Sequence, residues 1–365
     1  MLDLFYPYVP REAIDEVSDV LRSRFIGQGP KVELFEKEFS KKFSVQHAVS
    51  LNSGTSALET AYDLIGLKEG DEVISTPLTC TATNLPLLRR GVKIVWADID
   101  ENTLCIDPYS AWGKITEKTK AIVQVHLGGI PALVSEFTDL ELTNKQTGRL
   151  IPVVSDAAQA LGVFTGDYTC CSFQAIKHIT TIDGGMIVVN SEKEFKEAKL
   201  LRWFGIDREK KILNNWQAYT KRAMTFDIEL PGCKRHMNDV SAVMGIVGLQ
   251  HYDEVIEHRK TIFDIYKHEL HLIDGIKLVD GPGNTYWLAT VLVERRDEFA
   301  KMLFEADVDT NLVQVRNDVY KVFGGKRADL PVMNRLEEKY ISIPLTMNTT
   351  EDDAMYICKK IKGGW

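Results

Sequence analysis

The chain has 365 residues, of which 44% are hydrophobic and 26% are charged. This length exceeds what one compact core usually organises, so we expect two domains. The 52 acidic residues outnumber the 44 basic ones, and the net charge of −8 argues against a nucleic-acid-binding surface. Apolar runs fall short of the roughly 20 residues that cross a bilayer, and the N-terminal residues do not resemble a signal peptide. We therefore expect a cytoplasmic protein without a membrane partner.

Helical and strand-like segments alternate through the first two-thirds of the chain. Residues 30–43 have the pattern of a helix, and another helix is expected to begin near Leu58 in LETAYDLI. Six short apolar runs are expected to be strands: 73–78, 93–98, 121–127, 150–156, 169–174 and 185–190. Continuous Val- and Ile-rich runs fit strands that are buried on both faces of a mostly parallel sheet. The pattern predicts an α/β fold.

The pattern changes after about residue 245. A long helical stretch covers 244–270, and it is followed by a strand candidate, a helix and a final helix: 286–294, 297–307 and 351–361. We therefore predict a large α/β domain over 1–245 and a smaller α+β domain over 246–365. The boundary is expected in or beside the long helix, within the few-residue error of such assignments.

Two common kinds of site have little support in the sequence. The six cysteines lack metal-ligand spacing, so we expect no metal site and free thiols in a reducing compartment. No Gly-x-Gly-x-x-Gly motif follows a strand, because GQGPKV over 27–32 lacks the final glycine. A nicotinamide cofactor is therefore disfavoured.

A turn of small residues runs directly into the helix that contains Leu58. The segment reads NSGTSAL over 52–58, and it includes Gly54, Thr55 and Ser56. Unpaired backbone N–H groups and the positive end of the helix dipole would both point at a ligand there. An anion such as a phosphate is favoured at this turn, although such a motif alone is more often a simple capped helix start.

A lysine and an acid follow two of the later strand candidates. Lys177 lies shortly after Ser172 in CSFQAIKHITTIDGG, and Asp156 ends the run that leads into SDAAQALG. Open α/β sheets place their ligands at such carboxyl ends of strands. A pyridoxal phosphate (PLP) enzyme needs an amine to hold the aldehyde as a Schiff base, an anion for the pyridine nitrogen and donors for the phosphate. Lys177, Asp156 and the turn over 52–58 are candidates for these three tasks.

Nine segments in a consistent order carry a resemblance to a known family. They are FIGQGPKVELFEKEF, NSGTSALETA, GDEVISTPLTCTATN, VKIVWADID, VQVHLGG, VVSDAAQALG, SFQAIKHITT, DGGMIVVN and GCKRHMNDVSAVMG. Through nearly its whole length, the chain resembles the sugar aminotransferases of the DegT/DnrJ/EryC1/StrS family. The resemblance implies a fold-type I PLP-dependent transferase, with a mostly parallel sheet in the large domain.

The resemblance assigns roles to individual residues of this chain. Lys177 matches the Schiff-base lysine, Asp156 the partner of the pyridine nitrogen, and Gln159 the contact to the ring oxygen. The positions that match the family's phosphate-binding segments are Gly54, Thr55, Ser56 and Ser172. These residues are the cofactor-binding set that the resemblance implies.

Two positions depart from the family pattern within the expected cofactor site. Lys234 lies in GCKRHM, where an asparagine is common in the family. The resemblance implies that this segment reaches the neighbouring subunit's phosphate, in a homodimer with shared sites. A lysine there would still suit a phosphate, as a point charge. Cys80, in PLTCTATN, occupies the position where many relatives place an aromatic on the cofactor ring. The residue that stacks on the ring is therefore left open.

Three further residues are candidates for substrate contacts. His126, in VQVHLGG, resembles the family's histidine before a glycine turn, and a hydrogen-bonded strand-end histidine is an equally good interpretation. Arg316 and Asn317 lie in a polar cluster after an apolar strand. They are expected either to contact a substrate carboxylate or sugar phosphate, or to form a solvated turn.

The resemblance also implies the reaction. Glutamate or another amino acid would donate its amino group, and a nucleotide-linked keto sugar would accept it, most often at a 4-keto-6-deoxy or 3-keto position. His178 follows Lys177, and some related dehydratases replace the lysine with histidine. A PLP-dependent deoxysugar dehydratase is therefore one alternative. A non-catalytic regulatory protein on the same fold is another, and it is disfavoured by the intact Lys177, Asp156 and Gln159.

Overall fold

The protein is described here by a computed structural model that covers residues 1–134, 142–144, 148–207, 228 and 230–365. Its centre is a seven-stranded sheet with the order β1-β7-β6-β5-β4-β2-β3. Neighbouring strands from β6 to β3 run parallel, whereas β7 is antiparallel to both β6 and β1. The strands are β1 (His47–Leu51), β2 (Glu72–Ser75), β3 (Lys93–Trp96), β4 (Thr119–Val125), β5 (Val153–Asp156), β6 (Tyr168–Ser172) and β7 (Gly185–Val189). The predicted mostly parallel sheet is confirmed.

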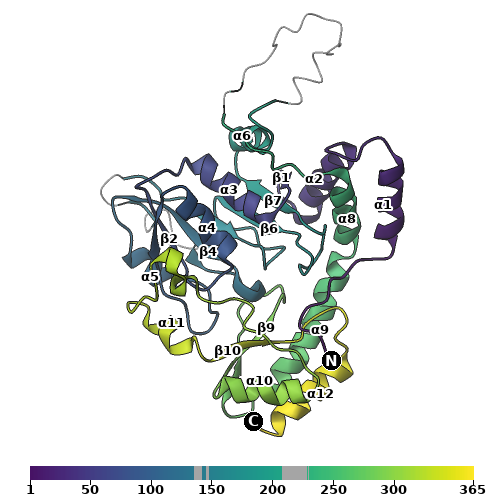
Figure 1. Cartoon of the computed structure of the whole chain (residues 1–365), viewed down its shortest axis with the longest axis vertical. Helices are drawn as coiled ribbons and strands as arrows, with labels where there is room; N and C mark the ends of the chain where they lie inside the picture. The colour runs from purple at the N-terminus through teal and green to yellow at the C-terminus, as the bar shows by residue number, and fades with distance from the viewer. Residues whose placement is uncertain (135–141, 145–147, 208–227, 229) are drawn as a thin grey trace, which may run out of the picture.

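Helices cover both faces of this sheet (Figure 1). Residues of α3, α4 and α6 pack in one hydrophobic cluster with the sheet, and residues of α2 and α8 pack in another. The helices of this part are α1 (Glu12–Arg22), α2 (Pro30–Phe43), α3 (Gly54–Ile65), α4 (Thr81–Arg89), α5 (Pro108–Gly113), α6 (Glu192–Arg202) and α8 (Asp239–Gln250), with a short 3-10 turn η1 (Leu127–Gly129). The result is a three-layer α/β arrangement.

The strand β7 shows why continuous apolar runs mark this sheet. Ile187 and Val189 join the cluster beneath α3, whereas Met186 and Val188 join the cluster beneath α2. Successive side chains of a strand point to opposite faces, so a strand between two helical layers needs apolar residues at every position. All five residues of β7 are buried.

The helix α3 begins where small polar residues replace the apolar strand β1. The side chain of Ser53 caps it by accepting a hydrogen bond from the backbone N–H of Ser56. At the other end, Gly66 adopts a left-handed conformation with φ of 75°, which terminates the helix. These two signals fix the position of the first turn relative to the end of β1.

The C-terminal part is built on the long helix α9 (Tyr252–Leu270) and a three-stranded antiparallel sheet. The sheet has the order β10-β9-β8, and its strands are β8 (Ile276–Leu278), β9 (Ala289–Val293) and β10 (Tyr340–Ile343). The remaining helices are α10 (Arg296–Glu305), α11 (Pro331–Leu336) and α12 (Glu351–Lys362), with 3-10 turns η3 (Asn317–Val319) and η4 (Lys321–Phe323). Figure 1 places α9, α10 and α12 together at the lower end of the molecule.

One feature of this region differs from the prediction. The expected continuous helix over 244–270 is two helices, α8 and α9, which are separated at His251. The residues of α8 pack with the large sheet, whereas those of α9 from Ile262 to Leu270 pack with β9 and β10. The break allows one helical path to pack against two different cores.

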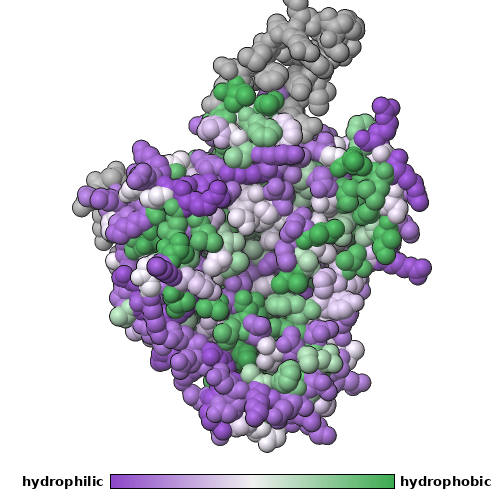
Figure 2. All heavy atoms as spheres, viewed as in Figure 1, coloured by the Kyte–Doolittle hydropathy of each residue, from purple (hydrophilic) through white to green (hydrophobic). Residues whose placement is uncertain are grey.

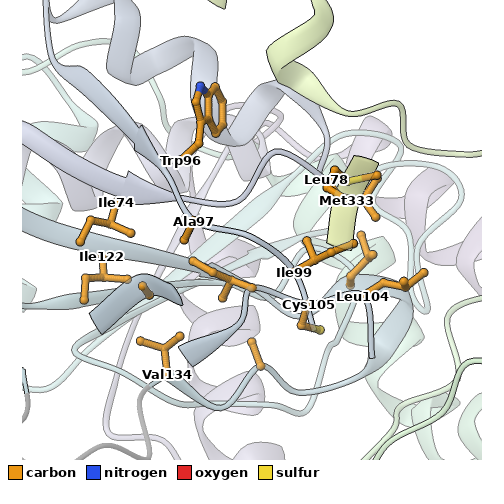
Figure 3. Packing of buried hydrophobic residues seen from close by; sticks show 14 of the residues in the cluster. Ile74, Leu78, Trp96, Ala97, Ile99, Leu104, Cys105, Ile122, Val134 and Met333 are labelled. Atoms are coloured by element: carbon orange, nitrogen blue, oxygen red, sulfur yellow. The ribbon is translucent and has the colours of Figure 1, made fainter. Parts of the chain in front are cut away.

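The two parts of the chain are also in contact away from α9. Met333 of α11 packs in the same hydrophobic cluster as Leu78, Trp96 and Ile99, which lie in or just after strands β2 and β3 (Figure 3). The division into 1–245 and 246–365 stays a prediction, which the separate cluster around α9, α10 and α12 supports. Among the described residues, no helix combines the length and hydropathy required to span a bilayer.

Candidate active site

The first turn of α3 lies tightly against the end of β6. A Cβ added to Gly54 would lie 2.8 Å from the Cβ of Ser172, so only glycine allows this approach. The hydroxyl of Ser56 donates to the Asn52 side chain at 2.7 Å, and Ser53 caps the turn. Backbone N–H groups in a first helical turn have no acceptor within the helix, and the helix dipole is positive there. Gly54, Ser56 and Ser172 are thus brought together around an anion-binding turn.

Asp156 ends β5 in a buried position, as the sequence predicted for a strand-end acid. Its Oδ2 accepts a hydrogen bond from the Thr83 hydroxyl at 2.7 Å, and its Oδ1 accepts one from the Ala158 N–H at 3.0 Å. Burial raises the pKa of Asp156, while these two hydrogen bonds and the charge of Lys177 lower it. Both hydrogen-bond donors are neutral, so an ionised Asp156 calls for a cationic partner.

Lys177 lies between β6 and β7, within electrostatic reach of Asp156 and Cys80. Burial lowers the pKa of this lysine to about 8, against the opposing effect of those two neighbours. A substantial neutral fraction of the amine is therefore present near neutral pH. Its Nζ lies 3.9 Å from the ring centroid of Trp287, a residue that sequence reasoning did not select.

Gln159 contacts the turn η1, and His126 directly precedes it. The Oε1 of Gln159 accepts a hydrogen bond from the Gly128 N–H at 2.8 Å, which leaves its amide nitrogen as a donor. His126 is fully buried, and its Nδ1 accepts from the Ala132 N–H at 2.9 Å. Its Nε2 lies 3.2 Å from the Thr165 hydroxyl, and burial lowers the pKa of His126 to about 3. This neutral histidine uses both nitrogens inside the protein, which favours the structural interpretation.

Cys80 is exposed at the N-cap position of α4. Nearby, Asn317 of the C-terminal part donates its amide to the Thr79 carbonyl at 2.7 Å and accepts from the Asn84 amide at 2.9 Å. The Asn317 backbone N–H also donates to the Pro77 carbonyl at 2.6 Å. Asn317 therefore holds the loop before Cys80, and these contacts occupy its side chain.

The guanidinium of Arg316 forms hydrogen bonds with neighbouring carboxylate and amide side chains. Its Nε and Nη2 donate to the two oxygens of Asp318 at 2.7 and 2.6 Å, and its Nη1 donates to Asn334 and Glu337, each at 2.6 Å. The side chain of Arg316 is only 2% exposed. A bidentate pair of this kind positions the polypeptide, and it does not present the guanidinium to a substrate.

The segment around Lys234 runs beside the start of α3. The Arg235 carbonyl accepts a hydrogen bond from the Asn52 N–H at 2.7 Å, and the Arg235 guanidinium pairs with Asp63 at 2.6 Å and Glu59 at 3.3 Å. Lys234 itself is exposed. The buried arginine anchors the segment, whereas the preceding lysine is left at the surface.

The structure brings Lys177, Asp156 and the first turn of α3 to one edge of the sheet, whereas Lys234 lies at the surface. The substrate candidates His126, Arg316 and Asn317 form hydrogen bonds within the protein. Thr83 and Trp287 are the two site residues that sequence reasoning missed. Thr83 could have been found as a hydroxyl one turn after Cys80 in CTATN. Trp287 had no such signal, because it lies within an apolar run that predicted only a strand.

The residues at this edge fit PLP. The first turn of α3 and Ser172 provide donors for a phosphate, and the buried carboxylate of Asp156 lacks a cationic hydrogen-bond donor in the described part of the chain. Lys177 is an amine with a lowered pKa beside that acid. Together with the sheet topology, these residues define a PLP-dependent transferase of fold-type I.

Comparisons with known proteins give the family. The model of the DegT/DnrJ/EryC1/StrS aminotransferase family matches residues 7–362. The spore coat polysaccharide biosynthesis protein SpsC of Bacillus subtilis is 32% identical, over 98% of this chain and 95% of that protein. The GDP-perosamine synthase of Escherichia coli O157:H7 is 27% identical, over 99% of this chain and 97% of that protein.

Comparison with solved structures also finds aminotransferases. The sugar aminotransferase CalS13 from Micromonospora echinospora is 29% identical, with a TM-score of 0.91 and complete coverage of both chains, 100% each. Spr1654 from Streptococcus pneumoniae in its PLP form is 26% identical, with a TM-score of 0.88 and coverage of 99% of this chain and 98% of that one. The chain belongs to the DegT/DnrJ/EryC1/StrS aminotransferase family. The expected PLP-dependent aminotransferase is confirmed, in a family whose members include sugar aminotransferases.

Proposed function

We propose that this protein transfers the amino group of glutamate to a nucleotide-linked keto sugar, in the biosynthesis of an amino sugar. The observation that carries the proposal is the placement of Lys177, whose pKa burial lowers to about 8, beside the buried acid Asp156. The GDP-perosamine synthase among its relatives supports a nucleotide-linked acceptor, as does the role of SpsC in polysaccharide biosynthesis. A 4-keto-6-deoxy sugar is the acceptor that we favour.

Asp156, Gln159 and the first turn of α3 are proposed to bind and orient the cofactor. PLP, when bound, supplies an aldehyde that reacts with amines and a ring that withdraws electrons from the substrate carbon. Asp156 would pair with the protonated ring nitrogen, since it is a buried carboxylate with two neutral donors already in place. The amide nitrogen of Gln159 is proposed as the donor to the ring oxygen, because its side-chain oxygen already accepts a hydrogen bond from the Gly128 N–H.

The phosphate is proposed to lie at the N-terminus of α3. Gly54, Thr55 and Ser56 form the first turn, and the Ser172 hydroxyl lies beside it. Backbone N–H groups and the helix dipole favour an anion at this position. Cys80 is proposed to border the cofactor ring, and its small side chain would leave room on that face that an aromatic ring would otherwise fill.

Lys177 is proposed as the residue that moves the proton. As a neutral amine, its Nζ can accept the α-proton of the amino donor and return a proton in the sugar half of the reaction. Burial makes this neutral state accessible, because the charged form of a lysine is disfavoured away from water. Asp156 does not take up this proton in the proposed mechanism, since it is held by two hydrogen-bond donors.

A homodimer with shared sites is proposed from the surface around Lys234. Lys234 is exposed, and Phe204, whose N–H faces the Cys233 carbonyl, is 41% exposed beside it. Hydrophobic side chains also gather near α1 and α8 (Figure 2), and the exposed ones on and after α1 are Ile14, Leu21, Phe25 and Ile26. Exposed apolar area of this kind is typical of an interface. Lys234 would reach the phosphate bound by the neighbouring subunit.

The dehydratase alternative has less support than transamination. His178 is 1% exposed, and its Nε2 lies 2.7 Å from the Thr285 carbonyl. Burial lowers the pKa of His178 to about 3, so it is a neutral residue bonded to the backbone. Lys177 keeps the position of the reactive amine. A cytoplasmic location stays a prediction from the sequence.

The acceptor class is tested by comparing three groups of compounds with glutamate as donor. Nucleotide 4-keto-6-deoxyhexoses should be aminated faster than the corresponding free keto hexoses, because remote diphosphate and base contacts orient the reacting carbon. The Lys177→Ala variant is the control for non-enzymatic transfer. Faster turnover of ordinary 2-keto acids than of every nucleotide sugar would contradict the proposal and indicate an amino-acid aminotransferase.

A further inference from the structure

The side chain of Lys177 rests on an aromatic ring from the C-terminal part of the chain. Its Nζ lies 3.9 Å from the ring centroid of Trp287, well within the range of a cation–π contact. Such a contact contributes more when water is excluded, and Trp287 is only 2% exposed. The amine of Lys177 is therefore held by a neutral ring as well as by the charge of Asp156.

Trp287 is itself fixed from several directions. Its indole N–H donates to the Ile176 carbonyl at 3.1 Å, and its backbone N–H donates to the Gly128 carbonyl at 3.1 Å. Its own carbonyl accepts from Arg259 at 3.2 Å. The ring of Phe5 packs against it with a centroid distance of 5.8 Å. A side chain with these contacts is a rigid platform, unlike the flexible lysine that it supports.

The choice of an aromatic partner has a chemical consequence. A lysine side chain has four rotatable carbons and loses up to about 2 kcal/mol of rotamer entropy when it is fixed. A carboxylate would hold the ammonium firmly, but it would also favour the charged form strongly. A ring face attracts the ammonium by about 0.5–2 kcal/mol, so it orients Nζ while leaving the neutral amine accessible.

We propose that Trp287 is a positioning residue that holds the Nζ of Lys177 over its indole face, so that the cofactor-free chain presents this amine to the incoming cofactor aldehyde. The inference rests on the proposed role of Lys177. It also links the two parts of the chain, because Trp287 precedes β9 whereas Lys177 lies between β6 and β7. The hydrogen bond from the indole to Ile176 fixes the ring one residue from the lysine that it supports.

The contact is tested on the cofactor-free chain by competitive acetylation of Lys177 as a function of pH, followed by mass spectrometry. The wild-type labelling midpoint is expected near the pKa of about 8 that burial imposes. Trp287→Leu keeps an apolar side chain but removes the ring, and it should lower the midpoint by about one unit. Trp287→Phe keeps a ring and should shift it less, in the same direction. A midpoint that is unchanged or raised in both variants overturns the proposal.

A second readout follows cofactor capture rather than turnover. The rate at which PLP is captured is monitored by visible absorbance at a pH above the labelling midpoints, where Lys177 is neutral in every variant. It should fall about tenfold in Trp287→Leu, because the released lysine regains rotamer freedom, and much less in Trp287→Phe. Phe5→Leu is the matched control, because it removes a ring that packs on Trp287 and leaves the indole under Lys177 in place. Equal slowing in Trp287→Leu and Phe5→Leu would reduce the effect to general packing and overturn the proposal. If Trp287→Leu fails to fold by circular dichroism, Trp287→Phe decides through its midpoint and capture rate.

The outcome can be separated from a failure of the proposed function. Borohydride reduction of the wild-type chain with PLP, followed by peptide mapping, shows which lysine carries the cofactor. An adduct on another lysine would contradict the role of Lys177, whereas the acetylation midpoints would still measure the contact with Trp287. An adduct on Lys177 with unshifted midpoints would overturn the positioning role alone.

Discussion

Replacing Thr83 by valine should remove hydrogen bonding to Asp156 while keeping the shape of the side chain at position 83. Thr83 donates its hydroxyl to Oδ2 of Asp156 at 2.7 Å, and the Thr79 hydroxyl lies 2.9 Å from the same oxygen of Thr83. Both threonines are buried. Because the Thr83 proton is used toward Asp156, the Thr79 hydroxyl is the donor between them. Valine has nearly the same volume as threonine, so Thr83→Val removes the hydrogen bond to Asp156 and the one from Thr79 without opening a cavity.

The magnitude follows from the charge on the acceptor. A hydrogen bond to a charged group contributes about 1.5–3 kcal/mol, which corresponds to about 1–2 pKa units on the carboxyl. Burial already raises the pKa of Asp156, and the Thr83 hydroxyl is the first of the groups that oppose it. The variant should therefore have a still higher pKa at this position. Cofactor binding near neutral pH should weaken, because less of Asp156 is ionised.

The same change makes the stability loss depend on pH. A carboxyl whose folded pKa lies above its unfolded value loses stability as the pH rises, because the unfolded chain ionises first. Below the unfolded value both states are protonated, and the charged hydrogen bond is absent. The free energy of unfolding lost in Thr83→Val should therefore increase as the pH rises from the ordinary carboxyl range to neutral pH, as Asp156 ionises.

The assay is urea unfolding of the cofactor-free variant across that pH range, with the wild-type chain alongside. Thr83→Ser is the control, since it keeps the hydroxyl and loses only a methyl group. Its loss of free energy should be independent of pH. A pH-independent loss in Thr83→Val, equal to that of the serine variant, would refute the role of this hydrogen bond at Asp156.

Three further predictions concern the cofactor turn, the loop before Cys80 and the subunit interface. Gly54→Ala should weaken PLP binding about tenfold in a titration, because its Cβ would lie 2.8 Å from that of Ser172; unchanged PLP affinity would argue against this steric cause. Asn317→Ala should lower the free energy of unfolding by about 1–3 kcal/mol in urea, since it removes the buried hydrogen bonds that join Asn317 to the Asn84 amide and the Thr79 carbonyl; a neutral substitution would show that the contacts are dispensable. Mixing Lys177→Ala chains with Lys234→Glu chains should restore part of the activity through hybrid dimers with one intact site, and hybrids that form but stay inactive would contradict the shared site.

The parts of the fold that sequence could predict are those with a local signal. The Val- and Ile-rich runs predicted the strands because burial on both faces demands apolar residues at each position, as in β7. Asp156 was placed correctly because an acid directly after such a run falls at a strand's carboxyl end. The strand β1 was not predicted, since its antiparallel pairing with β7 is a tertiary contact.

The parts that could not be predicted depend on side-chain contacts that form only in the folded protein. Arg316 and Asn317 looked like substrate ligands because polar residues followed an apolar strand, yet their partners are Asp318, Glu337 and the loop before Cys80. In the sequence, Trp287 resembles any buried strand residue, whereas in the structure its ring lies beside the Nζ of Lys177. The role of a charged or aromatic side chain depends on the residues that it contacts, and a single sequence does not contain that information.

The most direct test of the proposed function is the fate of isotopic nitrogen. The holoenzyme is incubated with glutamate that carries ¹⁵N and with a panel of nucleotide-linked keto sugars, and the products are analysed by mass spectrometry. The account predicts an amino sugar that contains ¹⁵N, formed in equal amounts with 2-oxoglutarate and absent with Lys177→Ala. A product that loses a hydroxyl without gaining nitrogen would contradict it and identify a dehydratase.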